Sequence, residues 1–199
     1  MRYISFDVGI KNLSMCEVEI PAAPGGDLEG LRIGAWRVID AGDGAGSAKD
    51  GAKAAKGADL VPACMRALER EVGECSAFPT WDRVLIENQP GLANPTMRVM
   101  QALIHAYFAL RHPGVPVAYV AAGGKTRAAA RIMGVELPKK VAYKDAKRLT
   151  VDAARRLLSN KSAGVEGAEA LRTLEEHKKK DDLCDALLQA VSYAAATAS

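Results

Sequence analysis

The sequence predicts an α/β domain in which helices flank a mixed five-stranded sheet. The first part of the chain, up to Ile39, holds three strand-like segments separated by turns, which is typical of an antiparallel meander. Beyond it, strand-like and helical segments alternate, as they do in βαβ units with parallel strands. A length of 199 residues suits one domain with a substantial core, so we expect residues 1–199 to form a single domain.

The three antiparallel strands are expected over residues 2–8, 13–20 and 31–39. The first is rich in residues that favour strands and carries an acid, Asp7, near its end. Residues 9–12 are expected to make a tight turn. The two segments that follow alternate apolar and polar side chains, which indicates strands with one buried face.

The remaining elements follow from changes in the hydrophobic period. Residues 41–57 are rich in Gly, Ala, Ser, Lys and Asp and hold no large apolar residue, which predicts a mobile surface loop. Gly123, Gly124 and Lys125 are expected to end the fifth strand. We expect helices over residues 60–72, 95–110 and 143–159, a helical piece over 171–177, and strands over 83–87 and 115–120.

Acidic residues lie at the ends of these elements in a pattern that favours a metal site. Asp7 and Glu87 end two strands, where an unpaired buried acid is costly and where ligands of α/β sheets collect. An amphipathic helix is expected from Leu183 onward, and Asp182 and Asp185 lie one turn apart at its start. A divalent cation would remove their repulsion, and Mg²⁺ and Mn²⁺ favour carboxylate ligands. Taken alone, the pair also fits a solvated helix start.

The composition is ordinary for a globular protein, with 49% hydrophobic and 26% charged residues. The net charge of +3 decides little, but basic residues concentrate over 125–156 and 178–180, which suits a phosphate backbone as well as a solvated helix surface. The four cysteines have no CxxC spacing, so we expect an intracellular, reducing compartment and neither zinc nor disulfides. No segment is apolar enough to span a membrane, and no signal peptide is expected.

Three motifs together resemble a known family. They are DVGIKN at residues 7–12, IENQP at 86–90 and KKDDLCDA at 179–186. In this order, and on these elements, they resemble the RuvC-type Holliday junction resolvases of the RNase H-like superfamily. The resemblance is strongest to the branch found in poxviruses, other large DNA viruses and fungal mitochondria. The loop at 41–57 and the long link at 161–177 depart from that pattern.

The resemblance implies an RNase H-like fold and a metal-dependent endonuclease. It assigns four carboxylates to both catalysis and metal binding, namely Asp7, Glu87, Asp182 and Asp185. The cofactor would be Mg²⁺ or Mn²⁺, with two ions per active site. Asp181 competes with Asp182 for the third position. Lys147 or Lys144 of the basic helix would steady the charged phosphorane, with Lys147 preferred and Lys125 a further candidate.

The expected partner is branched DNA, a four-way junction that is resolved by paired symmetric nicks during recombination or the resolution of replicated genomes. The two-fold symmetry of that substrate predicts a homodimer. The helix at 95–110 is the interface candidate, although its apolar residues fit core packing equally well. The viral branch suggests a protein that acts in the infected cell. The expected DNA contacts are Lys11, Lys125, Lys144, Arg148, Arg155, Lys179 and Lys180.

Other functions fit parts of the sequence. A ribonuclease H or a transposase-like nuclease would share the fold, but the Gln-Pro after Glu87 and the KKDD run favour a resolvase. An ATP-binding protein of the actin, chaperone and sugar-kinase superfamily also has a DxGxxN loop after its first strand, yet this chain has no second copy of that domain. A catalytically inactive scaffold for branched DNA would not need four acids that repel one another.

Overall fold

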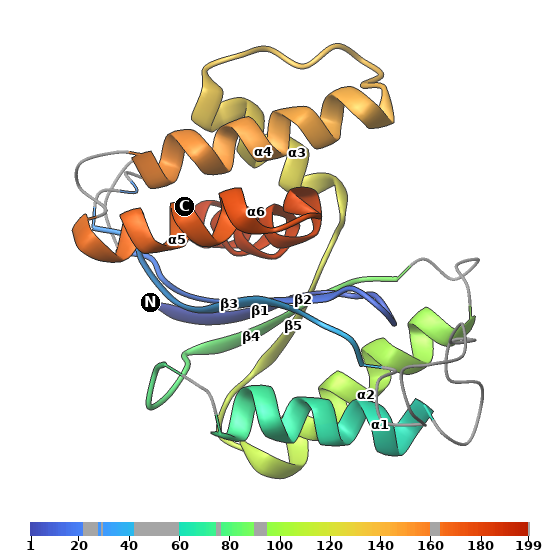
Figure 1. Cartoon of the computed structure of the whole chain (residues 1–199). Coiled ribbons are helices and arrows are strands. Elements are labelled where there is room, and N and C mark those ends of the chain that lie inside the picture. The colour runs from blue at the N-terminus through green and yellow to red at the C-terminus, as the bar shows by residue number, and fades with distance from the viewer. Residues whose placement is uncertain are drawn as a thin grey trace.

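The computed structural model describes residues 1–21, 28, 30–41, 60–74, 77–89, 95–159 and 164–198. Its sheet has the spatial order β3-β2-β1-β4-β5, in which β1 pairs antiparallel to β2 and parallel to β4 (Figure 1). The pairs β2–β3 and β4–β5 are antiparallel and parallel, respectively. The predicted mixed five-stranded sheet is therefore confirmed. The strands are β1 (Arg2–Asp7), β2 (Leu13–Glu19), β3 (Arg32–Ile39), β4 (Arg83–Glu87) and β5 (Val117–Val120).

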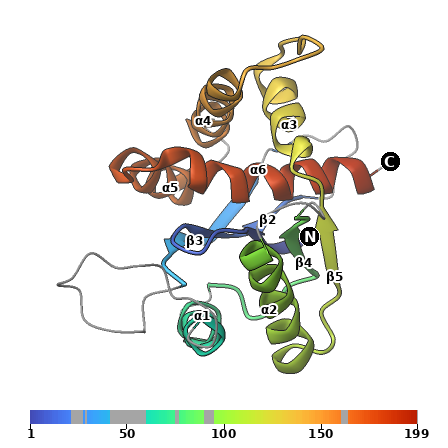
Figure 2. The same cartoon turned by 90° about the vertical axis from the view of Figure 1, so that its right-hand side faces the viewer.

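Helices cover both faces of this sheet. One face carries α1 and α2, and on the other α6 lies directly on the strands with α3 and α4 outside it (Figures 1 and 2). The helices are α1 (Leu60–Leu68), which continues as a π-helical segment (Glu69–Glu74), α2 (Pro95–Arg111), α3 (Gly123–Met133), α4 (Tyr143–Ser159), α5 (Gly164–Glu176) and α6 (Lys180–Thr197). None of the described helices is both long and apolar enough to cross a membrane.

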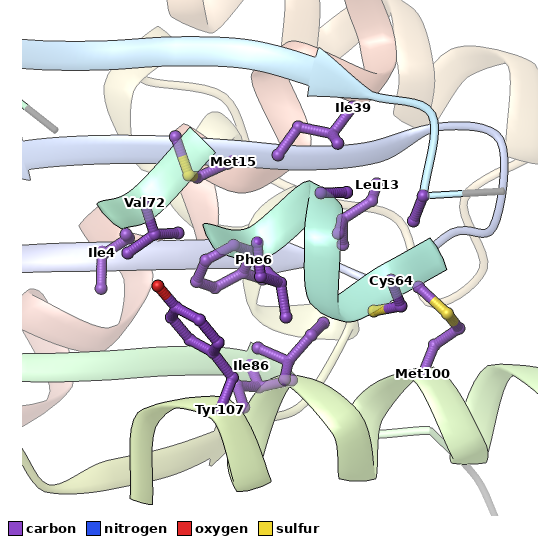
Figure 3. Close-up of a cluster of buried hydrophobic side chains, with 14 of the residues drawn as sticks. Ile4, Phe6, Leu13, Met15, Ile39, Cys64, Val72, Ile86, Met100 and Tyr107 are labelled. Atoms are coloured by element: carbon purple, nitrogen blue, oxygen red, sulfur yellow. The ribbon is translucent and has the colours of Figure 1, made fainter. Parts of the chain in front are cut away.

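Alternate residues of the central strands face two separate cores, as strand geometry requires. On the α1/α2 side, Ile4 and Phe6 of β1 pack with Ile86, Met100 and Tyr107 (Figure 3). On the α6 side, the intervening residues of β1 face the helix, and Tyr3 belongs to the cluster that includes Leu183 and Leu187. Asp7 has the same parity as Tyr3, so its side chain faces α6.

The helix at 95–110 contributes chiefly to the core. Met100, Ile104, Tyr107 and Phe108 are all buried, so these apolar residues are explained by packing within the chain. Two large apolar residues of α2 are exposed: Val99 is 43% exposed and Leu110 is 75% exposed. Any interface on this helix would use its outer face.

The fifth strand ends before Gly123 as predicted, but Gly123 and Gly124 begin helix α3, which was not predicted from the sequence. A Cβ added at Gly124 would lie 2.6 Å from Ser192 Oγ of α6, so the glycine is required for close packing of the two helices. The other elements agree within a few residues, although β5 starts at Val117 and the helical piece at 171–177 belongs to the longer α5. The loop predicted at 41–57 lies outside the described residues, except for Ala41.

Candidate active site

Asp7 and Glu87 lie side by side because they end neighbouring parallel strands. Phe6 of β1 pairs with Ile86 of β4, so the acid that follows each of them projects from the same edge of the sheet. This edge holds the carboxyl ends of β1, β4 and β5, the position where ligands bind in open α/β sheets. Gln89 supports the arrangement, since its Nε2 donates to Glu87 Oε2 at 2.8 Å.

Lys125 lies at the centre of the acids. Its Nζ donates to Asp7 Oδ1 and, at 2.9 Å, to Glu87 Oε1, and it lies 3.7 Å from Asp185 Oδ2. The residue is only 6% exposed. Lys125 was predicted as a DNA contact and as a further candidate to steady the phosphorane, and the structure places it among the predicted acids. Helix α3 begins immediately after β5 and carries the side chain into the acid cluster.

Helix α6 supplies the other two predicted acids. Asp182 and Asp185 lie in its first turns, and both line a cavity of about 360 Å³ together with Asp7, Glu87 and Lys125. The Oδ2 atom of Asp182 is buried and has no hydrogen-bond partner among the described residues. A buried carboxylate oxygen without a donor is unfavourable, so this atom favours a cation or a polar ligand in the cavity.

The electrostatics of the cluster follow from burial and from the shared lysine. Burial raises the pKa of Asp7 to about 8, although the positive charge of Lys125 lowers it. The neighbouring carboxylates of Glu87 and Asp185 raise it further. Burial also raises the pKa of Asp185 and of Asp182. Burial alone would raise the pKa of Glu87, but the charge of Lys125 lowers it below its ordinary value.

Lys125 stays protonated in this setting. Burial alone would lower the pKa of its ammonium, but the charges of Asp7, Asp185 and Glu87 raise it above the ordinary value. The cluster therefore holds one fixed positive charge among three acids, whose repulsion it reduces.

A second lysine of the cavity, Lys147, comes from the basic helix α4. Its Nζ donates to Asp181 Oδ2 and lies 4.9 Å from the ring centroid of Tyr143. Burial alone would raise the pKa of Asp181, but the hydrogen bond from Lys147 lowers it. Asp181 is thus occupied by Lys147 and is absent from the cavity lining, which favours Asp182 over Asp181 for the third acidic position.

The acids fit a pair of Mg²⁺ or Mn²⁺ ions by their chemistry, since all four supply the carboxylate oxygens that these hard ions prefer. The partnerless Asp182 oxygen supports the fit. As the described side chains stand, no three acidic, histidine or cysteine residues form a metal-holding group, and the Lys125 ammonium lies between Asp7 and Glu87 instead. Metal binding at this position requires the Lys125 side chain to move away.

A basic groove of about 350 Å³ adjoins the acid cavity at Lys147. It is formed by α4 and the residues around the start of α6, and its basic lining residues are Lys147, Arg148, Arg155, Lys178 and Lys180. Arg148 is open to solvent, with its side chain 77% exposed. Arg155 is held instead by Glu175, with Nε 2.6 Å from Oε1, and Lys180 Nζ donates to the His177 carbonyl at 3.1 Å.

The other predicted DNA contacts are exposed but dispersed. Lys144 lies on the open face of α4, and Lys179 precedes α6. Lys11 lies in the turn between β1 and β2. Of the predicted DNA contacts, Arg148, Arg155 and Lys180 line the groove, and so does Lys178, which belongs to the predicted basic run 178–180.

Comparisons with known proteins identify the fold. No family model matches the sequence. An uncharacterised protein of Acanthamoeba polyphaga mimivirus is 31% identical over an alignment of 124 residues, and the match covers 56% of this chain but only 28% of that protein. The chain thus matches well under two thirds of the length of this relative.

Solved structures are similar over nearly the whole chain. The complex of fowlpox virus resolvase with its substrate Holliday junction DNA has a TM-score of 0.60 at 15% identity and 99% coverage of both chains. Thermus thermophilus RuvC has a TM-score of 0.53 at 16% identity, covering 99% of this chain and 97% of that one. The chain therefore has the RNase H-like fold that these two resolvases share.

Proposed function

We propose that this protein is a metal-dependent endonuclease that resolves four-way DNA junctions by paired symmetric nicks. The observation that carries the proposal is the convergence of Asp7, Glu87, Asp182 and Asp185 on one cavity, at a sheet edge that adjoins a basic groove. Phosphodiester hydrolysis needs several carboxylates at one point and a cationic surface for the DNA backbone. Both are present here, and the similarity to two resolvase structures supports a branched substrate.

The four carboxylates would hold two Mg²⁺ or Mn²⁺ ions, which when bound activate the attacking water and stabilise the leaving oxygen. Asp7 lies at the end of the central strand and shares the Lys125 ammonium with Glu87 and Asp185, so it would be one of the ligands that hold the ions. Gln89 keeps the Glu87 carboxylate oriented through its hydrogen bond to Oε2.

Two lysines act on the phosphate in this proposal. Lys147 lies where the groove meets the cavity, so its ammonium can approach the phosphorus centre from the DNA side and stabilise charge that develops in the transition state. Lys125, once released from the acids, remains beside them and can neutralise the same phosphate. Asp181 positions Lys147 until DNA arrives.

Kinetics separate a catalytic lysine from a simple backbone contact. We expect Lys147→Ala to lower the single-turnover cleavage rate by roughly 100-fold, the scale of one lost transition-state donor, while junction affinity falls only a few-fold. Arg148→Ala serves as the matched control on the same helix and should change affinity alone. A Lys147→Ala enzyme with a normal rate and weakened binding would show that Lys147 only holds the DNA backbone.

We also propose that the protein acts as a homodimer and belongs to the viral branch of the resolvases. A two-fold assembly presents two identical sites to a two-fold junction. The outer face of α2, with exposed Leu110 and Val99, offers apolar surface for such an interface. The matches to mimivirus and fowlpox virus proteins support a viral protein that acts in the infected cell.

The decisive experiment compares substrates under one set of conditions. Purified protein is incubated with Mg²⁺ or Mn²⁺ and a four-way junction, a nicked duplex or an RNA–DNA hybrid, and its mass in solution is measured. We expect paired nicks in the junction, no activity in chelator or in Asp185→Asn, and a dimeric mass. A monomer that prefers the hybrid would instead indicate a ribonuclease H.

A further inference from the structure

Helix α6 lies along β1, and three links at regular intervals connect the two elements; together these links are called the ladder. At the site end, Asp185 and Asp7 share the Lys125 ammonium. One helical turn further along α6, Gln189 Nε2 donates to Ser5 Oγ at 3.1 Å. One more turn along, the rings of Tyr193 and Tyr3 meet edge to face with centroids 6.0 Å apart. These contacts join residues four apart on the helix to residues two apart on the strand.

The spacing of the ladder follows from the two backbone geometries. Four residues of an α-helix rise about 6.0 Å, and two residues of a strand advance about 6.6 Å, so the two series stay in step over this distance. The helix runs antiparallel to the strand. A slip of α6 by one residue would move its acids about 1.5 Å along the axis and turn them by about 100°.

Gln189 is the ladder member that can fix this register. It is fully buried, and its Nε2 also donates to the Phe6 carbonyl at 3.1 Å, directly before Asp7. The apolar residues around it, such as Leu187 and Ala190, tolerate small displacements because packing is not directional. A buried amide is not tolerant, since a slip would leave its donors unpaired in an apolar layer. A single polar residue fixes the register of coiled coils in the same way.

A second hydrogen bond holds the same helix from β3, two strands away from β1. Trp36 of β3 donates from Nε1 to the Leu183 carbonyl at 2.9 Å, between the two α6 acids in the sequence. Gln189 and Trp36 thus hold α6 at two points that flank Asp185. Neither side chain lines the acid cavity.

We propose that Gln189 is a positioning residue, which sets the register of α6 on β1 and so holds Asp182 and Asp185 opposite Asp7 and Glu87. The inference rests on the proposed function, because the geometry it protects is that of the metal-binding acids. Loss of groups that orient metal ligands typically costs about 10- to 100-fold in metal affinity or activity.

The test substitutes Gln189→Met, which keeps the length of the side chain but removes its donors. Leu187→Met, a buried neighbour on α6 that makes no side-chain hydrogen bond, is the matched control for repacking. For each protein we would measure the melting temperature, the rise in melting temperature with Mn²⁺, junction affinity in Ca²⁺, and the single-turnover rate. Ser5→Ala removes one of the two amide contacts and provides a milder variant.

We expect Gln189→Met to melt close to the wild type and to bind junctions equally well. It should need about 10- to 100-fold more Mn²⁺ for the same thermal shift and cleave at least about tenfold more slowly. Ser5→Ala should show a smaller loss of the same kind, and this variant decides the matter if Gln189→Met fails to fold. Leu187→Met should match the wild type in metal response and rate.

Two results would overturn the inference: an unchanged metal response and rate in both Gln189→Met and Ser5→Ala, or an equal loss in Leu187→Met. A wild-type protein whose melting temperature rises with Mn²⁺ but which cuts no DNA would overturn the proposed function. In that case the rise in melting temperature of the variants with Mn²⁺ would still test the role of Gln189. A wild type without either response would overturn both.

Discussion

Asp7→Asn should stabilise the metal-free protein, although it removes the central carboxylate of the site. The Asp7 side chain is 15% exposed, and burial raises its pKa to about 8 from an ordinary 3.8. The folded protein therefore holds a proton on Asp7 between these two pH values, while the unfolded chain has released it. Because the folded state binds more protons in this window, the contribution of Asp7 to stability is most favourable below pH 3.8 and declines as the pH rises to about 8.

The size of the effect follows from the two pKa values. One proton bound differently by the folded and unfolded states changes stability by about 1.4 kcal/mol per pH unit. At pH 7 the pH lies roughly three units above the pKa that Asp7 has in the unfolded chain. An aspartate at this position therefore lowers the free energy of unfolding by about 4 kcal/mol relative to a neutral group of the same shape. Asparagine has that shape and cannot ionise. Its carbonyl oxygen can still accept the hydrogen bond from Lys125, so we expect a gain of about 2–4 kcal/mol at pH 7.

Urea unfolding in chelator at several pH values between about 5 and 8 measures this gain. The difference in unfolding free energy between Asp7→Asn and the wild type should grow with pH, by at most about 1.4 kcal/mol per unit. Asp145→Asn is the control, since that side chain is 61% exposed and its loss should change stability by less than about 0.5 kcal/mol. A difference that stays constant with pH, or an Asp7→Asn protein less stable than the wild type, would refute the reasoning.

Three further substitutions test other parts of the molecule. Lys125→Met should destabilise the metal-free protein by about 3–5 kcal/mol because it breaks a buried ion pair, and Mn²⁺ should restore more of its stability than in the wild type, as calorimetry can show. Glu17→Gln should cost about 3 kcal/mol in urea unfolding. The buried Glu17 carboxylate accepts from the Ala35 and Ala77 amides and from Trp81 Nε1, and an amide cannot accept all three. Arg148→Glu should weaken binding to every junction alike and lower the salt slope by roughly 1–2, measured by titration at several salt concentrations.

The strand acids were predictable because the signal is local. Asp7 and Glu87 each interrupt an apolar segment at its end, and parallel pairing of those segments places the acids together by sheet geometry alone. The spacing of Asp182 and Asp185 predicted one helix face but also fitted a solvated helix start, and only the resemblance assigned both to the site. The mixed five-stranded sheet was also predictable from the order of the elements, because three antiparallel strands followed by crossovers leave few topologies.

The lysine at the centre of the acids could not be predicted in the same way. Gly123 and Gly124 favour a break, and only contact with Ser192, far along the chain, explains why glycine begins a helix there. Lys125 lies on this helix, which the sequence did not predict, so its place among the acids could not be predicted either. A signal was nevertheless present, since Lys125 follows a predicted strand whose carboxyl end adjoins that of the strand ending in Glu87.

The arrangement around Lys125 is itself an argument for function. A fold selected for stability alone would replace buried acids with apolar residues, because a buried ion pair seldom repays its desolvation. Here burial raises the pKa of Asp7 to about 8, and a buried oxygen of Asp182 has no hydrogen-bond partner among the described residues. Without metal, each of these features lowers the stability of the folded protein. Both costs would be removed by cations in the cavity, and both lie where two strands, α3 and α6 meet. Local conflicts of this kind are expected at functional sites, where the surrounding fold supplies the stability that the site gives up.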